Sequence, residues 1–341
     1  CVRLAGLLHD LGHAPFSHCT EWAMPALREL GIRTYAPEVL AARGDQRASH
    51  EDYTILILTG SSLRPLIEAH FPFTATHVAA LVSREVQVQD DFFRAGGRDF
   101  RVLLSQIVSS ELDVDRMDYL VRDSYFSGAD YGKIDTSWLL NNLSMFEVDD
   151  QVRLALERRA IYAFDDFMVA RYHMFTMVYF HHKSVIFEEM LKRYFQAPDC
   201  PYAIPASCEE YLGVDDVHLA HHLRGAADPW ARDIVAGREW KRALELHGEK
   251  VEVDWAVSAL SEQGIESITA SSVGKLSRYA VYGQKRSKAP PIHVLADSLD
   301  PTQGVMDLRD ASNIFDRYRD ERRIARVYVR PEQRERATAI L

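Results

Sequence analysis

The hydrophobic and polar positions of the first 200 residues repeat with the spacing of α-helices. Apolar side chains return every three or four residues over 78–84 and 100–125, which indicates amphipathic helices with one buried face. Ser49 stands three positions before an acidic residue, Asp52, and this pattern predicts an N-cap and a helix that runs to Leu58. This part of the chain is therefore predicted to be mainly helical.

The most apolar stretch of the chain, residues 161–187, is interrupted by polar side chains. Asp165, Asp166, Arg171 and three histidines lie within it. No apolar run in the sequence reaches the roughly 18 residues that a membrane-spanning helix needs. We therefore expect a long, largely buried helix here and no contact with a membrane.

The pattern changes after residue 197. The sequence Ala197-Pro198-Asp199-Cys200-Pro201 breaks the helical periodicity, and 205–262 has the pattern of further short helices. Residues 292–295 and 324–329 alternate like strands, with a helical stretch at 311–318 between them. The predicted fold is mainly α: a helical core at 1–200, a helical extension at 201–264 and a small C-terminal α+β subdomain at 265–341.

Composition and charge narrow the class of protein. The chain has 341 residues, 47% hydrophobic and 26% charged, which is typical of a soluble globular protein. The net charge of −10 argues against a surface coated by nucleic acid. Residues from Lys275 onward hold 14 basic and 9 acidic side chains, a balance typical of a solvated helix face. The four cysteines form no CxxC pair, so we expect a reducing, cytoplasmic location.

One decapeptide concentrates groups that bind metals and transfer protons: His9-Asp10-Leu11-Gly12-His13-Ala14-Pro15-Phe16-Ser17-His18. His9 and His13 would share one face of a helix, and Pro15 would end that helix so that His18 arrives from another direction. A metal or catalytic site is one interpretation. The other is a structural network of buried, mutually satisfied polar groups among the neighbouring leucines.

A second segment, residues 111–123, reads Glu-Leu-Asp-Val-Asp-Arg-Met-Asp-Tyr-Leu-Val-Arg-Asp. On a helix, Asp115, Tyr119 and Arg122 face one way, which suits a metal-bound phosphate with a sugar or base beside it. A solvated helix with salt bridges between successive turns explains the same residues.

Taken together, the two segments resemble the HD-domain phosphohydrolases, and in particular the branch of deoxynucleoside triphosphate triphosphohydrolases. The resemblance covers residues 1–195 and includes Arg171-Tyr172-x-Met174 through Tyr179-Phe180-His181, which is similar to the family's long helix past the substrate pocket. After Cys200 it weakens to general architecture. It implies a helical HD core and hydrolysis of nucleotides.

The resemblance implies a metal site on His9, Asp10 and Asp115. His and Asp ligands admit Mg, Mn, Fe, Ni or Zn, so the identity of the metal stays open. The family's first ligand is a histidine in a helix upstream of this motif. Because the sequence begins at Cys1 without Met and already has a helical pattern there, we expect that ligand to lie upstream of Cys1.

The resemblance also implies roles for two further groups of residues. The acid–base group comprises His13, His18, Glu21 and His50. Glu21 would orient an imidazole, and His50 would donate a proton to the leaving oxygen. The implied substrate-binding residues are Arg116, Tyr119, Asp123 and Arg171.

The expected activity is hydrolysis of dNTPs to a deoxynucleoside and tripolyphosphate. A nucleotide phosphatase or phosphodiesterase on the same fold is the alternative enzyme. The metal ligands do not distinguish these activities, because the residues that line the substrate pocket decide which substrate binds. A nucleotide-binding regulator without turnover is the third possibility, although such a protein needs no proton-transfer group. The resemblance implies a homo-oligomer packed through the α+β subdomain. Nothing in the sequence supports a nucleic-acid partner.

Overall fold

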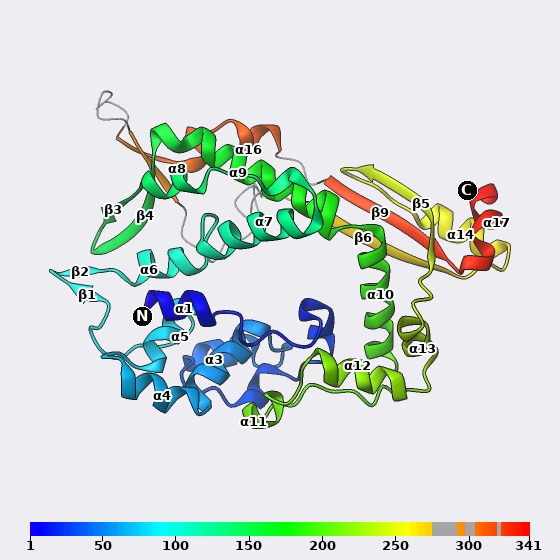
Figure 1. The fold of residues 1–341 in the computed structure, drawn as a ribbon, viewed down its shortest axis with the longest axis horizontal. Helices are drawn as coiled ribbons and strands as arrows, with labels where there is room; N and C mark the ends of the chain where they lie inside the picture. Colours follow the sequence, from blue (N-terminus) through cyan, green and yellow to red (C-terminus); the bar gives the residue numbers. More distant parts are fainter. Residues whose placement is uncertain (275–291, 297–303, 319–321) are drawn as a thin grey trace. The chain divides into compact units, whose positions relative to one another are not determined.

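The computed structural model describes residues 1–274, 292–296, 304–318 and 322–341, and it confirms a mainly helical fold with a smaller sheet region (Figure 1). The chain divides into two compact units. The first unit comprises Cys1–Met117, Ser144–Ala155 and Lys192–Asp228. The second unit comprises Asp118–Leu143, Leu156–Leu191 and Pro229–Leu341.

Helix α3 (His50–Gly60) lies in the core of the first unit. Its residues 52–58 are all buried, and it packs against α4 (Leu63–His70) and α5 (Ala75–Val82). Helix α5 in turn contacts α1 (Val2–Leu8) and α6 (Arg101–Val108). Ser49 caps α3 as predicted, because its side chain accepts a hydrogen bond from the Asp52 amide.

The remaining helices of the first unit are shorter or shared with the second unit. They are η1 (Ser17–Ala23), η2 (Leu27–Leu30), α2 (Pro37–Arg43), the first residues of α7 (Val114–Ser127), the last residues of α10 (His182–Gln196), α11 (Cys208–Tyr211) and α12 (Asp216–Gly225).

Strands also occur where only helices were expected. The strands β1 (Arg94–Ala95) and β2 (Arg98–Asp99) form a hairpin around two glycines with positive φ, and β2 pairs in parallel with β4 (Gln151–Glu157). The strand β3 (Leu143–Val148) pairs with β4 across a turn at Asp149, whose φ is 58°. Because this turn uses Asp instead of Gly, the hairpin has a weak sequence signature.

The second unit is built around a three-stranded antiparallel sheet in the order β5 (Lys241–Gly248), β9 (Arg322–Val329) and β6 (Ser267–Gly274). Alternate residues of β9 enter two cores. Tyr328 packs with Trp240 and Ile186, whereas Val327 packs with residues of α14 (Asp254–Glu262) and α17 (Arg334–Ile340).

The second unit contains further helices and two strands that belong to a different sheet. They are η3 (Asp130–Gly132), α8 (Thr136–Asn141), η4 (Arg158–Ala160), α9 (Ile161–Met174), the π-helix η5 (Phe175–Tyr179), α13 (Pro229–Val235), β7 (His293–Leu295), β8 (Val305–Asp307), α15 (Leu308–Ala311), α16 (Ile314–Arg317) and η6 (Pro331–Gln333). The strands expected at 292–295 and 324–329 are thus present, and β5 is an additional strand in the stretch expected to be helical.

Three predicted helices are interrupted. The helix expected over 161–187 ends at Met174 and passes through η5 before α10 begins, and the Tyr179 hydroxyl donates to Asp123 of α7 there. The helix expected over 100–125 is broken because Asp113 accepts a hydrogen bond from the Ser110 amide. Ser312, bound to Asp165, separates α15 from α16. Side-chain hydrogen bonds of this kind compete with the helix and leave the apolar periodicity intact.

Within the described part of the chain, no helix has the length and apolar character needed to cross a bilayer.

Candidate active site

The residues His9 to Gly12 form a turn directly after α1. The helix ends at Leu8, so His9 and His13 do not share a helix face as predicted. The Thr54 hydroxyl of α3 donates to the His9 carbonyl oxygen at 2.8 Å and accepts from the Gly12 amide at 2.9 Å. These two backbone groups are therefore satisfied by another helix, and α1 does not continue.

Gly12 lies directly against the backbone of α3. A Cβ atom at this position would overlap the His50 carbonyl oxygen and the Thr54 amide nitrogen. On its other side, the Tyr211 hydroxyl donates to the Gly12 carbonyl oxygen at 2.7 Å. The motif thus needs glycine for close packing of two backbones and not for a special φ.

The turn brings His9 and Asp10 next to Asp115 of α7, and one ligand atom of each lies within 4.8 Å of the others. The His9 Nε2 atom is 3.3 Å from Asp10 Oδ1 and 3.7 Å from Asp115 Oδ1. The other ring nitrogen, Nδ1, contacts the Gly6 carbonyl oxygen at 3.0 Å. Because a carbonyl oxygen only accepts, Nδ1 carries a hydrogen, and Nε2 faces the two carboxylates.

Electrostatics show that this group of three residues attracts a cation. Asp115, at the edge of hydrogen-bond reach, is the main cause that raises the pKa of His9 to about 9; Asp10 adds to the effect and burial opposes it. The buried Nε2 atom of His9 has no hydrogen-bond partner with acceptable geometry among the described residues. An imidazole nitrogen that faces two carboxylates and makes no well-formed hydrogen bond fits a divalent metal ion, with His9, Asp10 and Asp115 as candidate ligands.

A second cluster contains three imidazoles and one carboxylate. Glu21 Oε1 accepts hydrogen bonds from His50 Nδ1 at 2.8 Å and from His18 Nδ1 at 3.0 Å. Burial alone would raise the pKa of Glu21, but these two hydrogen bonds lower it to about 2. Glu21 is therefore a carboxylate at neutral pH, and it orients both rings so that each keeps Nε2 for other chemistry.

His13 completes this cluster and connects it to the metal-ligand group. Its ring stacks on His50 with centroids 4.1 Å apart and planes 7° apart. Burial and then the neighbouring His50 lower the pKa of His13 to about 4, so it is neutral at pH 7. Its Nε2 lies 3.6 Å from Asp10 Oδ1. One ligand atom each of His13, His18 and His50 lies within 4.8 Å of the others, so this cluster could also hold a cation. The hydrogen bonds that Glu21 accepts from two of the rings suit proton transfer as well.

A strained turn places His18 opposite the other two rings. Phe16 and Ser17 both have φ of 57°, a left-handed conformation that is unfavourable for residues with a side chain. The Phe16 amide donates to Asp216 at 2.8 Å, and Ser17 Oγ contacts His13 Nδ1 at 3.0 Å. These contacts stabilise the turn that carries the chain from Pro15 into η1.

The residues expected to bind substrate are placed differently from one another. Arg116 belongs to the first unit, and its buried guanidinium donates to Asp113 and to the Ser110 carbonyl oxygen. Tyr119, Asp123 and Arg171 belong to the second unit.

Within the second unit, Tyr179 connects two of these residues. The Tyr119 ring packs edge-on against Tyr179, and Asp123 accepts from the Tyr179 hydroxyl at 2.7 Å. The Arg171 guanidinium lies over the Phe175 ring, which itself packs against Tyr179. Tyr179 and Phe175 were not predicted, since the sequence pattern placed them in an uninterrupted helix.

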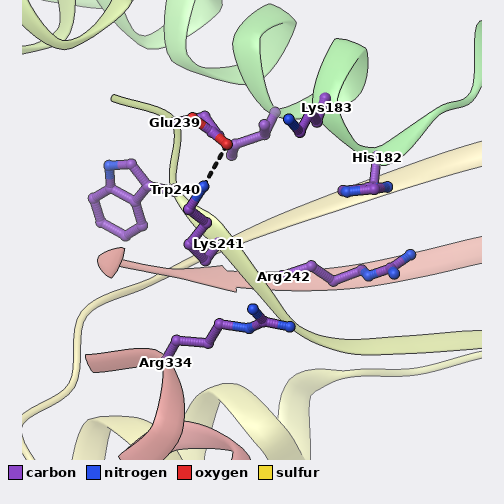
Figure 2. A pocket seen from close by; sticks show the side chains of 8 residues that line it. His182, Lys183, Glu239, Trp240, Lys241, Arg242 and Arg334 are labelled. Carbon is purple, nitrogen blue, oxygen red and sulfur yellow. Dashed lines mark hydrogen bonds and ion pairs between the residues drawn. The ribbon is translucent and has the colours of Figure 1, made fainter. Parts of the chain in front are cut away.

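The second unit contains a basic pocket of about 190 Å³, shown in Figure 2. Arg242 lies at the start of β5 and Arg334 at the start of α17. Glu239 is the acidic residue in the lining and accepts a hydrogen bond from Lys241 at 2.5 Å. The full lining is His182, Lys183, Ile186, Glu239, Trp240, Lys241, Arg242 and Arg334. Its character is thus opposite to that of the acidic metal-ligand group.

Comparison with known proteins relates the chain to one family. Residues 134–339 match the family described as the HD associated region. The chain is 30% identical over 246 residues to the uncharacterised protein YwfO of Bacillus subtilis, covering 66% of this chain and 47% of that protein. It is 24% identical over 277 residues to the human deoxynucleoside triphosphate triphosphohydrolase SAMHD1, covering 73% of this chain and 42% of that protein.

The chain thus spans less than half the length of these curated relatives. A crystal structure of a hypothetical protein from Aquifex aeolicus has a similar fold, with a TM-score of 0.71 at 22% identity. The match covers 99% of this chain and 79% of that one.

Proposed function

Because the chain belongs to the HD-domain phosphohydrolase superfamily, with the HD associated region over residues 134–339, we propose that it hydrolyses dNTPs to a deoxynucleoside and tripolyphosphate. The observation that carries this proposal is the pairing of two groups in one unit. His9, Asp10 and Asp115 form a set of metal ligands, and Glu21 holds two imidazoles beside them. The triphosphohydrolase activity named for SAMHD1 supports the choice of substrate.

His9, Asp10 and Asp115 would hold the divalent ion, which supplies charge stabilisation at the phosphate and lowers the pKa of a bound water molecule. Asp10 and Asp115 are anionic and would repel a phosphate, so the ion they hold would supply the attraction for it. The Gly6 carbonyl oxygen fixes the His9 ring so that Nε2 stays directed at the ligand position.

The acid–base step falls to His50. Water attacks the α-phosphorus and releases a proton to the solvent. The bond to the nucleoside 5′-oxygen breaks, and that oxygen leaves with a proton from His50 Nε2, which the ring then regains from the solvent. Glu21 accepts the hydrogen bond from His50 Nδ1 and so orients the ring that donates the proton. His13 stays neutral beneath the His50 ring, so it does not add a competing positive charge.

Product analysis tests the proposal. The chain is incubated with each dNTP and Mn²⁺ or Mg²⁺, and the products are separated by ion exchange. We expect tripolyphosphate and the deoxynucleoside in equal amounts, and neither product from an Asp115→Ala variant. Release of orthophosphate or of a nucleoside monophosphate would instead indicate the phosphatase or phosphodiesterase alternative.

The proposed substrate contacts are Arg116, Tyr119, Asp123 and Arg171, with Tyr119 against the deoxyribose. A ring at that position leaves no space for a 2′-hydroxyl, which would give the preference for deoxynucleotides. Tyr119→Ala is therefore expected to narrow the ratio of kcat/KM for dATP over ATP. An unchanged ratio would exclude this role for Tyr119.

We further propose that the chain forms a homo-oligomer in the cytoplasm through the C-terminal α+β subdomain, with domain limits near 200 and 264. None of the four cysteines forms a disulfide in the described part of the chain, which supports a reducing compartment. Light scattering after size exclusion tests the assembly, and a monomer at micromolar concentration would contradict it.

A further inference from the structure

Helix α3 carries more of the site than His50 alone. Thr54 lies four residues after His50 on the same helix, so the two side chains share one face. The Thr54 side chain is fully buried. Its hydroxyl makes two hydrogen bonds, and both go to the turn that holds the metal ligands.

The two partners of the Thr54 hydroxyl lie at opposite ends of the turn. The hydroxyl donates to the His9 carbonyl oxygen at 2.8 Å and accepts from the Gly12 amide at 2.9 Å. One side chain therefore fixes the backbone on both sides of Asp10. Since His50 lies on the same helix, that hydroxyl also sets the spacing between the metal ligands and the acid–base group.

Two further contacts hold the turn against its neighbouring helices. Gly12 lies against the α3 backbone with no room for a Cβ atom. The Tyr211 hydroxyl donates to the Gly12 carbonyl oxygen at 2.7 Å, and the Tyr211 ring stacks on Tyr53 of α3 at 4.1 Å. The turn is thus held between α3 and α11, and Thr54 is the contact that reaches the ligand residue His9.

We propose that Thr54 is a positioning residue: it holds the turn His9–Gly12, which carries the proposed metal ligands, in a fixed place on helix α3. This role rests on the proposed function, because it concerns the same site. It is tested through the affinity for the metal ion, which does not depend on the identity of the substrate. Thr54 touches neither a ligand side chain nor the reacting atoms. It acts through the backbone of His9 and Gly12.

Removal of the hydroxyl alone tests the proposal. Thr54→Val keeps the shape and leaves both backbone groups without their partner, whereas Thr54→Ser keeps the hydroxyl. Mn²⁺ affinity is measured by titration calorimetry on the full chain, and kcat and KM are measured with the dNTP that the wild type hydrolyses. We expect Thr54→Val to weaken Mn²⁺ binding by about 10- to 100-fold and to lower kcat similarly, while Thr54→Ser stays near the wild type.

Thr59→Val is the matched control, because Thr59 is on the same helix and its hydroxyl donates to the local Ile55 carbonyl oxygen at 2.7 Å, away from the turn. It should change neither Mn²⁺ affinity nor kcat. Hydrogen–deuterium exchange of the metal-free protein gives a readout independent of activity: uptake in the peptide containing Gly12 should rise in Thr54→Val and not in Thr54→Ser.

The outcomes separate this role from the proposed function. Wild-type Mn²⁺ affinity in Thr54→Val, equal loss in Thr54→Ser, or equal loss in Thr59→Val would each overturn the positioning role. A wild type that binds Mn²⁺ but releases no tripolyphosphate would overturn the substrate assignment and leave the test of Thr54 intact. A wild type that binds no Mn²⁺ would overturn both.

Discussion

The first unit contains two clusters built around carboxylates, and the clusters differ in how those carboxylates are paired. In the first cluster, the fully buried Asp52 carboxylate is well paired. It accepts hydrogen bonds from Tyr35 at 2.6 Å, from Arg43 at 2.6 and 3.0 Å, and from the Ser49 amide at 2.8 Å. Around His9, two carboxylates face one imidazole nitrogen that has no hydrogen-bond partner of acceptable geometry.

The difference separates stability from function. The Asp52 cluster is complete without any added group, so its hydrogen bonds contribute to folding. The His9 cluster sets two carboxylates against one imidazole, an excess of negative charge that suits the proposed divalent cation. Substitutions in the Asp52 cluster should therefore lower the free energy of unfolding, whereas substitutions in the His9 cluster should lower activity.

The largest effect is expected from Asp115→Ala. Removal of an anionic ligand should lower turnover by roughly 10⁴-fold and deplete bound metal, because the cation loses a direct ligand. Asp115 is partly exposed, so the free energy of unfolding of the metal-free protein should change by less than about 1 kcal/mol. Product release, elemental analysis and urea unfolding measure the three quantities.

Asp118→Ala on the same helix is the control for Asp115, since Asp118 is exposed and pairs with Arg122. It should leave metal content unchanged. If Asp115→Ala retains the metal and the turnover of the wild type, Asp115 is not a ligand.

His50→Ala should lower kcat by about 10²- to 10⁴-fold with unchanged metal content, as expected when a general acid is lost. His70→Ala is the matched control, because His70 is an exposed histidine whose Nδ1 contacts the Leu66 carbonyl oxygen of its own helix. Loss of metal in the His50 variant would make this histidine a ligand and contradict the division of roles.

In the complete cluster, Asp52→Asn should leave metal affinity nearly unchanged and lower the free energy of unfolding by about 3 kcal/mol, since Arg43 and the start of α3 lose a buried anion. The effect should depend on pH. Burial alone would raise the pKa of Asp52, but hydrogen bonds from Arg43 and Tyr35 lower it below its ordinary value. The stabilisation is therefore present above about pH 4, the pKa of an unfolded Asp, and is lost as the pH falls through the folded pKa.

Urea unfolding of the wild type and Asp52→Asn at pH 7 and pH 3 measures this dependence. The difference between the two proteins should be smaller at pH 3. An equal difference at both values would show that the Asp52 charge does not stabilise the fold.

The smallest effect is expected from Tyr35→Phe, which removes one hydrogen bond to Asp52 and leaves the Arg43 pair in place. The free energy of unfolding should fall by about 1.5 kcal/mol, in the range for a hydrogen bond to a charged group. A loss as large as that of Asp52→Asn would mean that the hydroxyl, and not the charge, dominates this cluster.

Much of the candidate site could be predicted because its residues are close in sequence. His9, Asp10, His13 and His18 fall within ten positions, and the capping pattern of Ser49 placed His50 at the start of a helix. Asp115 required the resemblance to a known family, because the spacing alone is equally typical of a solvated helix.

The remaining contacts depend on tertiary packing that one sequence does not reveal. Tyr211 reaches Gly12 across 199 positions, and no periodicity signals that contact. The Asp113 carboxylate, which binds Arg116, also accepts a hydrogen bond from the Ser110 amide and so interrupts the predicted helix. The apolar periodicity of the sequence gives no sign of this interruption. The β3–β4 hairpin was missed for a similar reason, since an Asp in a left-handed turn gives no strong signal.

The close approach at Gly12 has a consequence for mutational tolerance. Every single-base change of a glycine codon that alters the amino acid adds a Cβ atom, and here that atom would meet main-chain atoms of α3, which cannot rotate away. A saturation library scored for folding alone should therefore contain almost no substitutions at Gly12, whereas His9 and Asp10 should accept several. The position in the motif with no functional group would then be the least replaceable for folding, and the two proposed metal ligands near it would be constrained only when activity is selected.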